Sequence, residues 1–369
     1  MIKISRPPIV TFLRILFNNG RISISRLFHL MPWVIKFIFF EPFRIIELLL
    51  YNTKLSQYKI KKDPIFILGY YRSGTTYLQR LFIQDKRLGY QSVFHTSLPE
   101  LMLGFEKTLK PILSFITNTL KIENRFHKVP FRWDFPGEED VALIALGIEH
   151  SANWGNIFPK HLLDYYEKYV YFNVEERTCL TWKENYLYWI KKLSLKNKGR
   201  QLVLKSPPNT ARIKMLLEMF PNAKFVCIQR NPYDVYASSK IFWDLVIKLY
   251  ALQTISESEV RNVIVESFAG IMDRYEVNKH LIPKGNLVEV SYEDLAAHPF
   301  KVFKNIYNTL KIGDFNLYKK EVEVFIETFK NYKSNRNTIS EKDKLLLAEK
   351  WRNQIENWKA INNNAINFA

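Results

Sequence analysis

The sequence predicts a three-layer α/β fold with a central parallel sheet, a helical insertion and an N-terminal helical extension. Two observations support this prediction. Short, wholly apolar segments alternate with segments of helical periodicity, which is typical of strands buried between two layers of helices. The first apolar segment also leads through a glycine-rich loop into a helix, an order that suits the binding of an anion.

Four buried strands are expected, at residues 64–68, 202–204, 225–228 and 287–290. Ligands of open parallel sheets bind beyond the carboxyl ends of the strands. The loops that follow residues 68, 204 and 228 are therefore expected to carry the functional groups.

Helices are expected to follow three of these strands. The helix after the first strand carries Leu78, Leu81 and Phe82 at helical spacing. Asn209 is expected to cap the helix after the second strand, and another helix is expected to begin near Pro232 after the third. This alternation predicts one α/β domain over residues 63–369, preceded by an extension over residues 1–62.

The extension is basic and rich in large apolar side chains. Residues 1–62 hold eleven Lys and Arg but only two acids, and so carry half of the net charge of +18. This composition is typical of a helix that lies on an anionic membrane surface. The alternative is a helical lid on the domain with solvated charges. Lys36, Glu41 and Arg44 interrupt the apolar run before a spanning length accumulates, and no secretory cleavage site is evident.

The segment from about residue 98 to 200 separates the first two strands and is expected to form a helical insertion. Its many aromatic residues make it the expected binding region for an acceptor molecule. The alternative is a helical cap with an ordinary aromatic core.

The first loop runs from Gly69 to Thr76 and matches the phosphate-loop pattern G-x-x-x-x-G-K-[ST], except that Thr75 replaces the lysine. Backbone N–H groups and the helix N-terminus still favour an anion there, so a P-loop-like fold is expected. The lysine that would reach the outer phosphates of a nucleoside triphosphate is missing. The third strand ends in Gln229-Arg230 instead of a metal-binding Asp, so a magnesium-dependent NTPase is poorly supported.

A second anion site is expected after the third strand. Arg230 follows the strand, and Ser238 lies two turns into the next helix, so both groups are placed to hold a phosphate. Arg230 alone fits a salt bridge equally well. Together with the first loop, the pair indicates a ligand with two separated anionic groups.

The two motifs, R-S-G-T-T and R-N-P-x-D-V-x-x-S, resemble those of the sulfotransferase superfamily, most closely the bacterial-type branch with G-x-x-R-S-G-T-T. Residues 202–221 and 288–299 are also similar to that family, and the resemblance covers roughly residues 64–335. It implies 3′-phosphoadenosine 5′-phosphosulfate (PAPS) as co-substrate. The 5′-phosphosulfate contacts that it implies are Arg72, Ser73, Gly74, Thr75 and Thr76, and the 3′-phosphate contacts are Arg230 and Ser238.

The resemblance also implies a basic loop over the nucleotide, which assigns Lys333 and Arg336 to the 3′-phosphate. For these two residues, solvated charge is the alternative interpretation. Lys205, at the end of the second strand, matches a lysine that family members place beside the sulfuryl group.

The sequence leaves open which residue is the general base that takes the proton of the acceptor hydroxyl. Cytosolic family members follow the lysine with Thr-His, but this sequence has Ser206-Pro207. His95 lies where other branches place a catalytic Glu, and its ordinary pKa suits a base. Glu138 and Glu139 lie in an acidic segment that resembles one of this branch, although acids in a first helical turn often only offset the helix dipole.

The expected activity is transfer of a sulfuryl group to a hydroxyl of a hydrophobic or lipid-like acceptor. The histidines show no metal-ligand spacing, so no metal is expected, and no nucleic-acid-binding motif is present. Cys179 and Cys227 are expected to be core thiols in a reducing compartment, which favours the cytoplasm. The extension adds the expectation of peripheral contact with the cytoplasmic membrane face. The alternatives are an atypical P-loop kinase or NTPase and a non-enzymatic basic membrane-binding protein.

Overall fold

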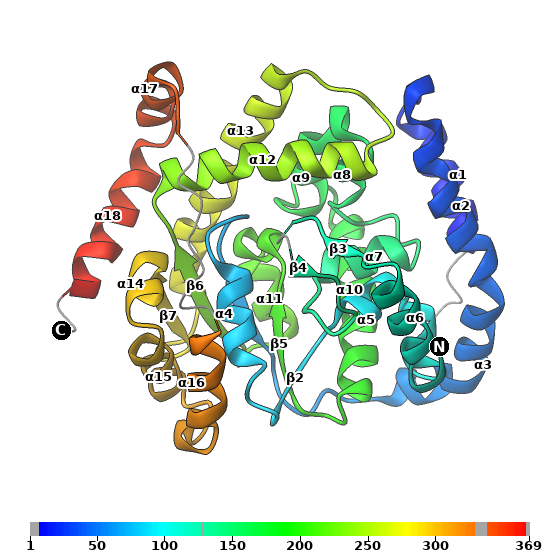
Figure 1. Ribbon diagram of the computed structural model, residues 1–369, viewed down its shortest axis with the longest axis horizontal. Helices are drawn as coiled ribbons and strands as arrows, with labels where there is room; N and C mark the ends of the chain where they lie inside the picture. Colours follow the sequence, from blue (N-terminus) through cyan, green and yellow to red (C-terminus); the bar gives the residue numbers. More distant parts are fainter. Residues whose placement is uncertain (1–6, 127–128, 329–337, 367–369) are drawn as a thin grey trace. The chain divides into compact units, whose positions relative to one another are not determined.

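The computed structural model describes residues 7–126, 129–328 and 338–366 (Figure 1). The chain divides into two compact units. Unit 1 comprises Met1–Lys61, Tyr90–Arg200 and Phe242–Val260, and unit 2 comprises Lys62–Gly89, Gln201–Ile241 and Arg261–Ala369. The N-terminal segment thus belongs to the same unit as the aromatic insertion, while both anion-site motifs belong to unit 2.

A parallel sheet forms the centre of unit 2. Its strand order is β2 (Leu88–Tyr90), β5 (Gln201–Lys205), β1 (Ile65–Leu68), β6 (Lys224–Gln229) and β7 (Leu287–Ser291). β1 pairs with β5 and β6, and β6 pairs with β7, all in parallel. The four predicted strands are confirmed to within a residue or two at their ends. β2 was not predicted, because three residues are too few to show a pattern.

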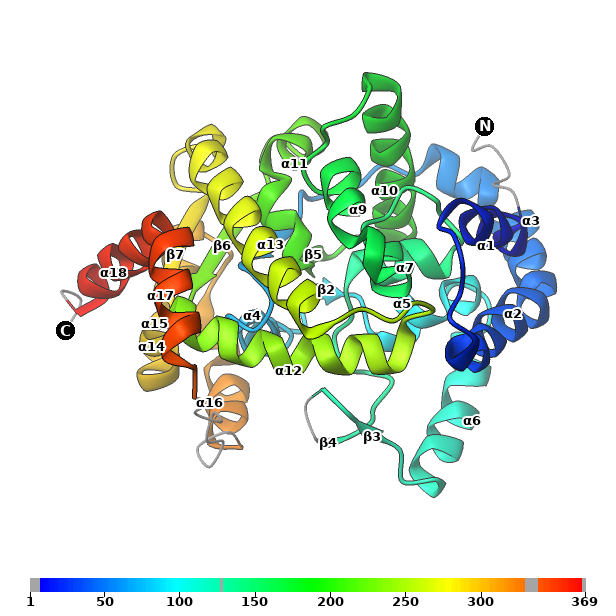
Figure 2. The ribbon, with the colours of Figure 1, turned by 90° about the horizontal axis from the view of Figure 1, so that it is seen from above.

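Helices cover both faces of this sheet, which confirms the three-layer prediction (Figures 1 and 2). Alternate strand residues such as Ile67 and Val226 pack against α4 (Thr75–Phe82), α15 (Pro299–Leu310) and α16 (Lys319–Glu327). From the other face, Phe66 contacts the ring of Phe220, which follows α11 (Ile213–Met219). The strands are therefore buried on both sides, as their wholly apolar sequences indicate.

The remaining helices of unit 2 follow the last strand. They are α14 (Tyr292–Ala297), α17 (Glu341–Lys350) and α18 (Arg352–Ile366). Two long helices, α12 (Pro232–Tyr250) and α13 (Glu257–Asn278), contribute residues to both units. The predicted helix start at Pro232 is confirmed.

The predicted cap at Asn209 is wrong. Residues Pro207–Ala211 form a 3₁₀ turn, and α11 begins only at Ile213. Pro207 and Pro208 have no backbone N–H to donate, and Asn209 lies inside the tight turn that they begin. The side-chain oxygen of Asn209 accepts instead from Arg212 at 3.2 Å.

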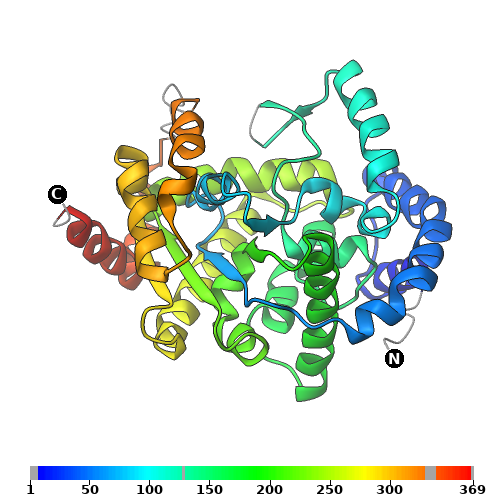
Figure 3. The same cartoon turned by 90° about the horizontal axis from the view of Figure 1, so that it is seen from below.

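Unit 1 is mostly helical (Figure 3). Its helices are α1 (Pro8–Asn18), α2 (Leu30–Phe39), α3 (Glu41–Gln57), α5 (Val93–Ser97), α6 (Glu106–Thr119), α7 (Glu139–Ala145), α8 (Trp154–Ile157), α9 (Leu162–Tyr169) and α10 (Glu176–Lys196). An antiparallel pair, β3 (Glu123–Asn124) and β4 (Val129–Pro130), follows α6. Within the described ranges, none of the helices is both long and apolar enough to cross a bilayer.

Candidate anion-binding site

The loop between β1 and α4 has a backbone that few residues adopt. Gly69, Arg72 and Gly74 have φ angles of 140°, 68° and 101°. A Cβ atom on Gly74 would lie 2.4 Å from Cδ2 of Tyr292, and one on Gly69 would lie 2.6 Å from the carbonyl oxygen of Ile228. Both glycines are therefore required by the backbone conformation and by close approach of neighbouring groups.

Hydrogen bonds hold this loop in shape. The hydroxyl of Ser73 donates to the carbonyl oxygen of Tyr70 at 2.7 Å, and the N–H of Gly69 donates to Oγ1 of Thr210 at 2.8 Å. The N–H of Ser73 also reaches the Tyr70 carbonyl, at 3.2 Å. Ser73 thus directs both of its donors into the loop. The N-cap residue of α4 is Gly74, which has no side chain to cap the N–H groups of Thr75 and Thr76. That N-terminus carries a partial positive charge suited to an anion.

The structure brings the second motif to this loop. Nε of Arg72 donates to the hydroxyl of Ser238 at 2.9 Å, and Nη1 of Arg230 donates to the Arg72 carbonyl oxygen at 3.3 Å. Arg72 belongs to the first loop, Arg230 follows β6 and Ser238 lies in α12. Residues 158 and 166 positions apart in the sequence are thus direct neighbours in unit 2.

The guanidinium group of Arg230 is largely withdrawn from water. Its side chain is 11% exposed, and it stacks at 4.6 Å over the ring of Tyr292. The only ion pair described for it is a 3.6 Å contact with Asp234, whose carboxylate is half exposed. Within the described residues, its buried Nε has no hydrogen-bond partner. A buried donor in this state favours an anionic ligand.

Lys205 is the last residue of β5 and pairs in register with Ile67 of β1. Its side chain is buried at the carboxyl edge of the sheet, the edge from which the first loop also leaves. Lys333 and Arg336 lie outside the described residues.

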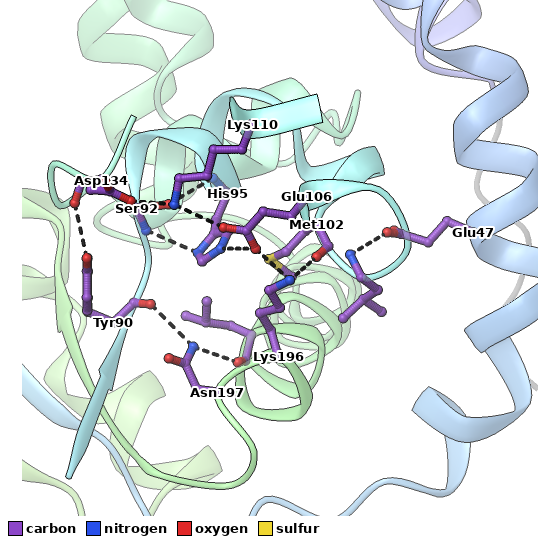
Figure 4. A network of polar contacts seen from close by, with 12 residues as sticks. Glu47, Tyr90, Ser92, His95, Met102, Glu106, Lys110, Asp134, Lys196 and Asn197 are labelled. Atoms are coloured by element: carbon purple, nitrogen blue, oxygen red, sulfur yellow. Dashed lines mark hydrogen bonds and ion pairs between the residues drawn. The ribbon is translucent and has the colours of Figure 1, made fainter. Parts of the chain in front are cut away.

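His95 lies in unit 1, in a network of charged groups (Figure 4). The backbone N–H of Ser92 donates to its Nδ1 at 3.2 Å, so Nδ1 carries no proton. Nε2 therefore donates to Glu106, at 3.1 Å. The bond to Nδ1 completes a capping box at the start of α5, and with Nε2 on Glu106 both ring nitrogens of His95 are engaged.

Burial lowers the pKa of His95 and outweighs the opposing effect of Glu106. Burial alone would raise the pKa of Glu106, but hydrogen bonds from His95 and Lys196 outweigh it and keep that pKa low. Lys196 contacts the Glu106 carboxylate at 2.5 Å and Lys110 contacts it at 3.1 Å. The network thus contains a neutral imidazole beside an ionised carboxylate.

The two predicted glutamates have different surroundings. Glu139 is fully buried in α7, where it accepts hydrogen bonds from Gln91 at 2.6 Å and Tyr186 at 3.2 Å. Glu138 occupies the N-cap position of α7 and is only partly buried. The prediction that one of His95, Glu138 and Glu139 is the base stays a prediction, and of the three Glu138 has the most solvent-accessible side chain.

Metal-binding groups and cysteines are other features that could supply functional chemistry. In the part of the chain that the structure describes, no three His, Cys, Asp or Glu side chains gather as a metal-binding group. Among the described residues, neither Cys179 nor Cys227 forms a disulfide, and burial raises the pKa of Cys227 well above its ordinary value.

Sequence reasoning missed two residues of the site, Tyr292 and Glu293. Tyr292 stacks on Arg230 and closes over Gly74. Glu293 accepts a 2.9 Å hydrogen bond from the N–H of Asn231, the residue after Arg230. Both lie in a segment already recognised as similar to the family, but neither shows a spacing that indicates its partner.

These features form a site suited to an anionic ligand at the carboxyl edge of a parallel sheet, without a phosphate-loop lysine. The chain belongs to the sulfotransferase family, whose model matches residues 64–316. That match confirms the predicted superfamily and the predicted enzymatic class. The span includes the first loop, Lys205, Arg230 and Ser238.

Proteins similar in sequence or in fold are also sulfotransferases. Omega-hydroxy-beta-dihydromenaquinone-9 sulfotransferase Stf3 of Mycobacterium bovis and that of Mycobacterium tuberculosis are each 24% identical over 310 residues, which cover 84% of this chain and 78% of the relative. Among solved structures, STF9 from Mycobacterium avium has a TM-score of 0.66 at 15% identity, covering 85% of this chain and 81% of STF9. STF1 from M. tuberculosis has a TM-score of 0.65 at 14% identity, covering 86% of both chains. The two structures show a shared fold.

Proposed function

We propose that this sulfotransferase uses PAPS as donor and transfers its sulfuryl group to the hydroxyl of a lipid-like acceptor. The observation that carries the donor assignment is the meeting of Arg72, Arg230 and Ser238 in unit 2. The first loop, which leads into the N-terminus of α4, suits the 5′-phosphosulfate. Arg230 and Ser238 suit the 3′-phosphate, because a charge-assisted pair holds a phosphate strongly.

The proposed reaction is an in-line displacement at sulfur. A bond forms between the acceptor oxygen and sulfur, while the bond from sulfur to the 5′-phosphate oxygen breaks and leaves adenosine 3′,5′-bisphosphate. Lys205 stabilises negative charge on the sulfuryl oxygens. Glu138 takes the proton of the acceptor hydroxyl, since its side chain is more accessible than those of Glu139 and His95.

The proposed acceptor is an apolar alcohol. The relatives named above are sulfotransferases of an omega-hydroxylated menaquinone, which is a lipid with a terminal hydroxyl. Unit 1 holds the aromatic insertion expected to bind such a molecule. The proposed location is the cytoplasm, where cysteines stay reduced, and the two cysteines form no disulfide within the described residues.

Nucleotide binding tests the donor site. Arg230→Ala should weaken the binding of adenosine 3′,5′-bisphosphate by about 1–3 kcal/mol, because a charged hydrogen bond is lost, and titration calorimetry measures this change. Lys304→Ala, which removes an exposed charge from α15, is the matched control and should bind like the wild type. An unchanged affinity in Arg230→Ala would show that Arg230 does not contribute to nucleotide binding.

A kinetic experiment tests the role of Lys205. Lys205→Ala should lower the single-turnover rate of transfer from PAPS by about 10²- to 10³-fold, because the lysine stabilises charge that develops on the sulfuryl group. Adenosine 3′,5′-bisphosphate lacks that group, so its affinity should change little. An equal loss of rate and of affinity for this product would assign Lys205 to nucleotide binding instead.

A further inference from the structure

The outward side of α2 and the first half of α3 is wholly apolar. From residue 30 to residue 50, every exposed side chain is apolar, including Ile35, Ile38, Phe39, Ile45, Leu49 and Leu50. Leu49 is 80% exposed and Leu50 is 65% exposed. A surface helix of a water-soluble protein shows the opposite pattern, with polar residues outward.

The charged residues of this stretch point inward or pair with each other. Nζ of Lys36 contacts Glu100 at 2.9 Å and the carbonyl oxygen of Ala145 at 2.7 Å. Arg44 pairs with Glu41 at 2.5 Å. Glu47 is buried, pairs with Lys192 of α10 and accepts from the N–H of Leu103 at 2.7 Å. All four charges between residues 30 and 50 are thus neutralised within unit 1, and none faces solvent alone.

Helix α6 extends the apolar surface. Its inner residues pack with α3 in one cluster, in which the rings of Phe43 and Phe105 lie 5.1 Å apart. The outer residues Ile112, Phe115 and Ile116 are exposed, as are Leu120 and Ile122 just beyond the helix. We call the exposed apolar side chains of residues 30–50 and 112–122 the outer apolar face.

The outer apolar face concentrates the exposed apolar residues of the chain. Together with α1 and the turn after it, residues 10–50 and 112–122 hold nineteen of the twenty-seven large exposed hydrophobic side chains in the described residues. An open apolar hollow of about 560 Å³ lies among α1, α2 and α3. Contiguous apolar surfaces of this kind mark sites of interaction rather than ordinary surface.

In the segments that flank this face, residues 51–62, 104–111 and 118–125, exposed basic side chains outnumber the exposed acid Glu123. Lys54, Lys59 and Lys61 are exposed at and beyond the end of α3, and Lys107 and Lys121 are exposed near the two ends of α6. Neither acid of the described residues 7–61, Glu41 or Glu47, is exposed. An apolar patch with a positive border complements an anionic bilayer, in which lipid headgroups lie around an apolar interior.

We propose that the outer apolar face docks unit 1 onto the surface of an anionic lipid bilayer. The exposed side chains of α2, α3 and α6 enter the boundary between headgroups and acyl chains, and the lysines remain among the headgroups. Docking goes beyond the proposed reaction and does not depend on it. Only its purpose, to give the enzyme access to a lipid-like acceptor, rests on the proposed function.

Vesicle flotation of the purified full-length protein, without donor or acceptor, tests this proposal. Wild-type protein should bind vesicles with about 30 mol% phosphatidylglycerol at least tenfold more strongly than pure phosphatidylcholine vesicles, and the preference should weaken from about 0.1 M to about 0.5 M salt. The triple variant Leu49→Ser, Leu50→Ser, Phe115→Ser should bind at least ~30-fold more weakly, because it exposes hydroxyls where apolar side chains enter the bilayer.

The matched control replaces equally exposed apolar residues of unit 2, Leu345→Ser with Leu317→Ser, and should bind like the wild type. Circular dichroism and melting temperature confirm that both variants are folded. Wild-type-like binding by the triple variant, or an equal loss in the control, would overturn the proposal. So would a wild-type dimer that the triple variant abolishes and that binds no vesicles, because the face would then join two copies of the chain.

Discussion

Glu139 has no exposed surface, and burial raises its pKa to about 7 against the opposing hydrogen bond from Gln91. The two neighbouring acids, Asp140 and Glu138, add to the rise. At the residue scale, this carboxyl group is therefore protonated in the folded protein under conditions in which it is ionised in the unfolded chain.

A raised pKa in the folded state predicts a pH dependence of stability. The stabilising contribution of Glu139 is fully present below its ordinary pKa of 4.5 and is lost as pH rises to about 7. The free energy of unfolding should decline by roughly 3 kcal/mol over this range from this group alone. In Glu139→Gln, most of that decline should disappear.

Urea unfolding of the wild type and of Glu139→Gln at pH 5 and pH 8 measures the difference. Glu184→Gln, which removes an exposed carboxyl group from α10 of the same unit, is the matched control and should keep the pH profile of the wild type. Parallel pH profiles for wild type and Glu139→Gln would show that Glu139 is ionised in the fold.

His95 shows what residue types alone do not reveal. Its ordinary pKa makes it a reasonable base from the sequence. Its hydrogen-bond partner Glu106 is eleven residues away, and Lys196, which holds Glu106, comes from the end of α10. No short spacing links these three residues, so the network that occupies His95 emerges only once unit 1 is folded.

At the scale of elements, Glu293 links three parts of unit 2. One carboxylate oxygen accepts from the N–H of Asn231 at 2.9 Å. The other accepts from the hydroxyl of Ser291 at 2.9 Å and from the indole N–H of Trp358 in α18 at 3.3 Å. Because Asn231 follows Arg230, this carboxylate connects the C-terminal helix to the loop that carries the proposed phosphate contact.

Glu293→Gln should therefore affect nucleotide binding without touching the nucleotide. The new amide places an N–H donor against other donors and loosens the loop, which should weaken binding of adenosine 3′,5′-bisphosphate by about 3- to 10-fold. Trp358→Phe is the control that removes only the contact from α18 and should have a smaller effect. A lower melting temperature with unchanged nucleotide affinity would limit Glu293 to a purely structural role.

The strands were predictable because burial on both faces makes them wholly apolar, which is a local signal. The first loop was predictable because two glycines at fixed spacing indicate its backbone conformation. β2 and the 3₁₀ turn at residues 207–211 were missed, since one is too short and the other depends on two prolines. The outward direction of the apolar side chains in α2 and α3 could not be read from the sequence, because an apolar stripe looks alike whether it faces a core or a membrane.

At the scale of the whole molecule, the net charge of +18 is unevenly placed. Unit 2 contains Arg72, Lys205 and Arg230 of the candidate anion site, whereas unit 1 carries exposed lysines beside the outer apolar face. The sequence predicted this division of charge in outline, since half of the excess lies in residues 1–62. It did not reveal that the N-terminal segment and the insertion belong to one compact unit, because their contacts link residues far apart in the chain.

Each unit is built from three separate stretches of the chain, and this has a consequence for synthesis on the ribosome. The sheet of unit 2 begins with β1 but lacks its last strand until Ser291 has been made, and α18 must follow before Glu293 gains Trp358. Unit 1 likewise waits for Phe242–Val260. Parallel strands joined over such long separations form slowly. The nascent chain therefore carries unpaired strands of unit 2 until β7 has been made, and it carries the apolar helices α1–α3 without the rest of unit 1 until Phe242–Val260 has emerged.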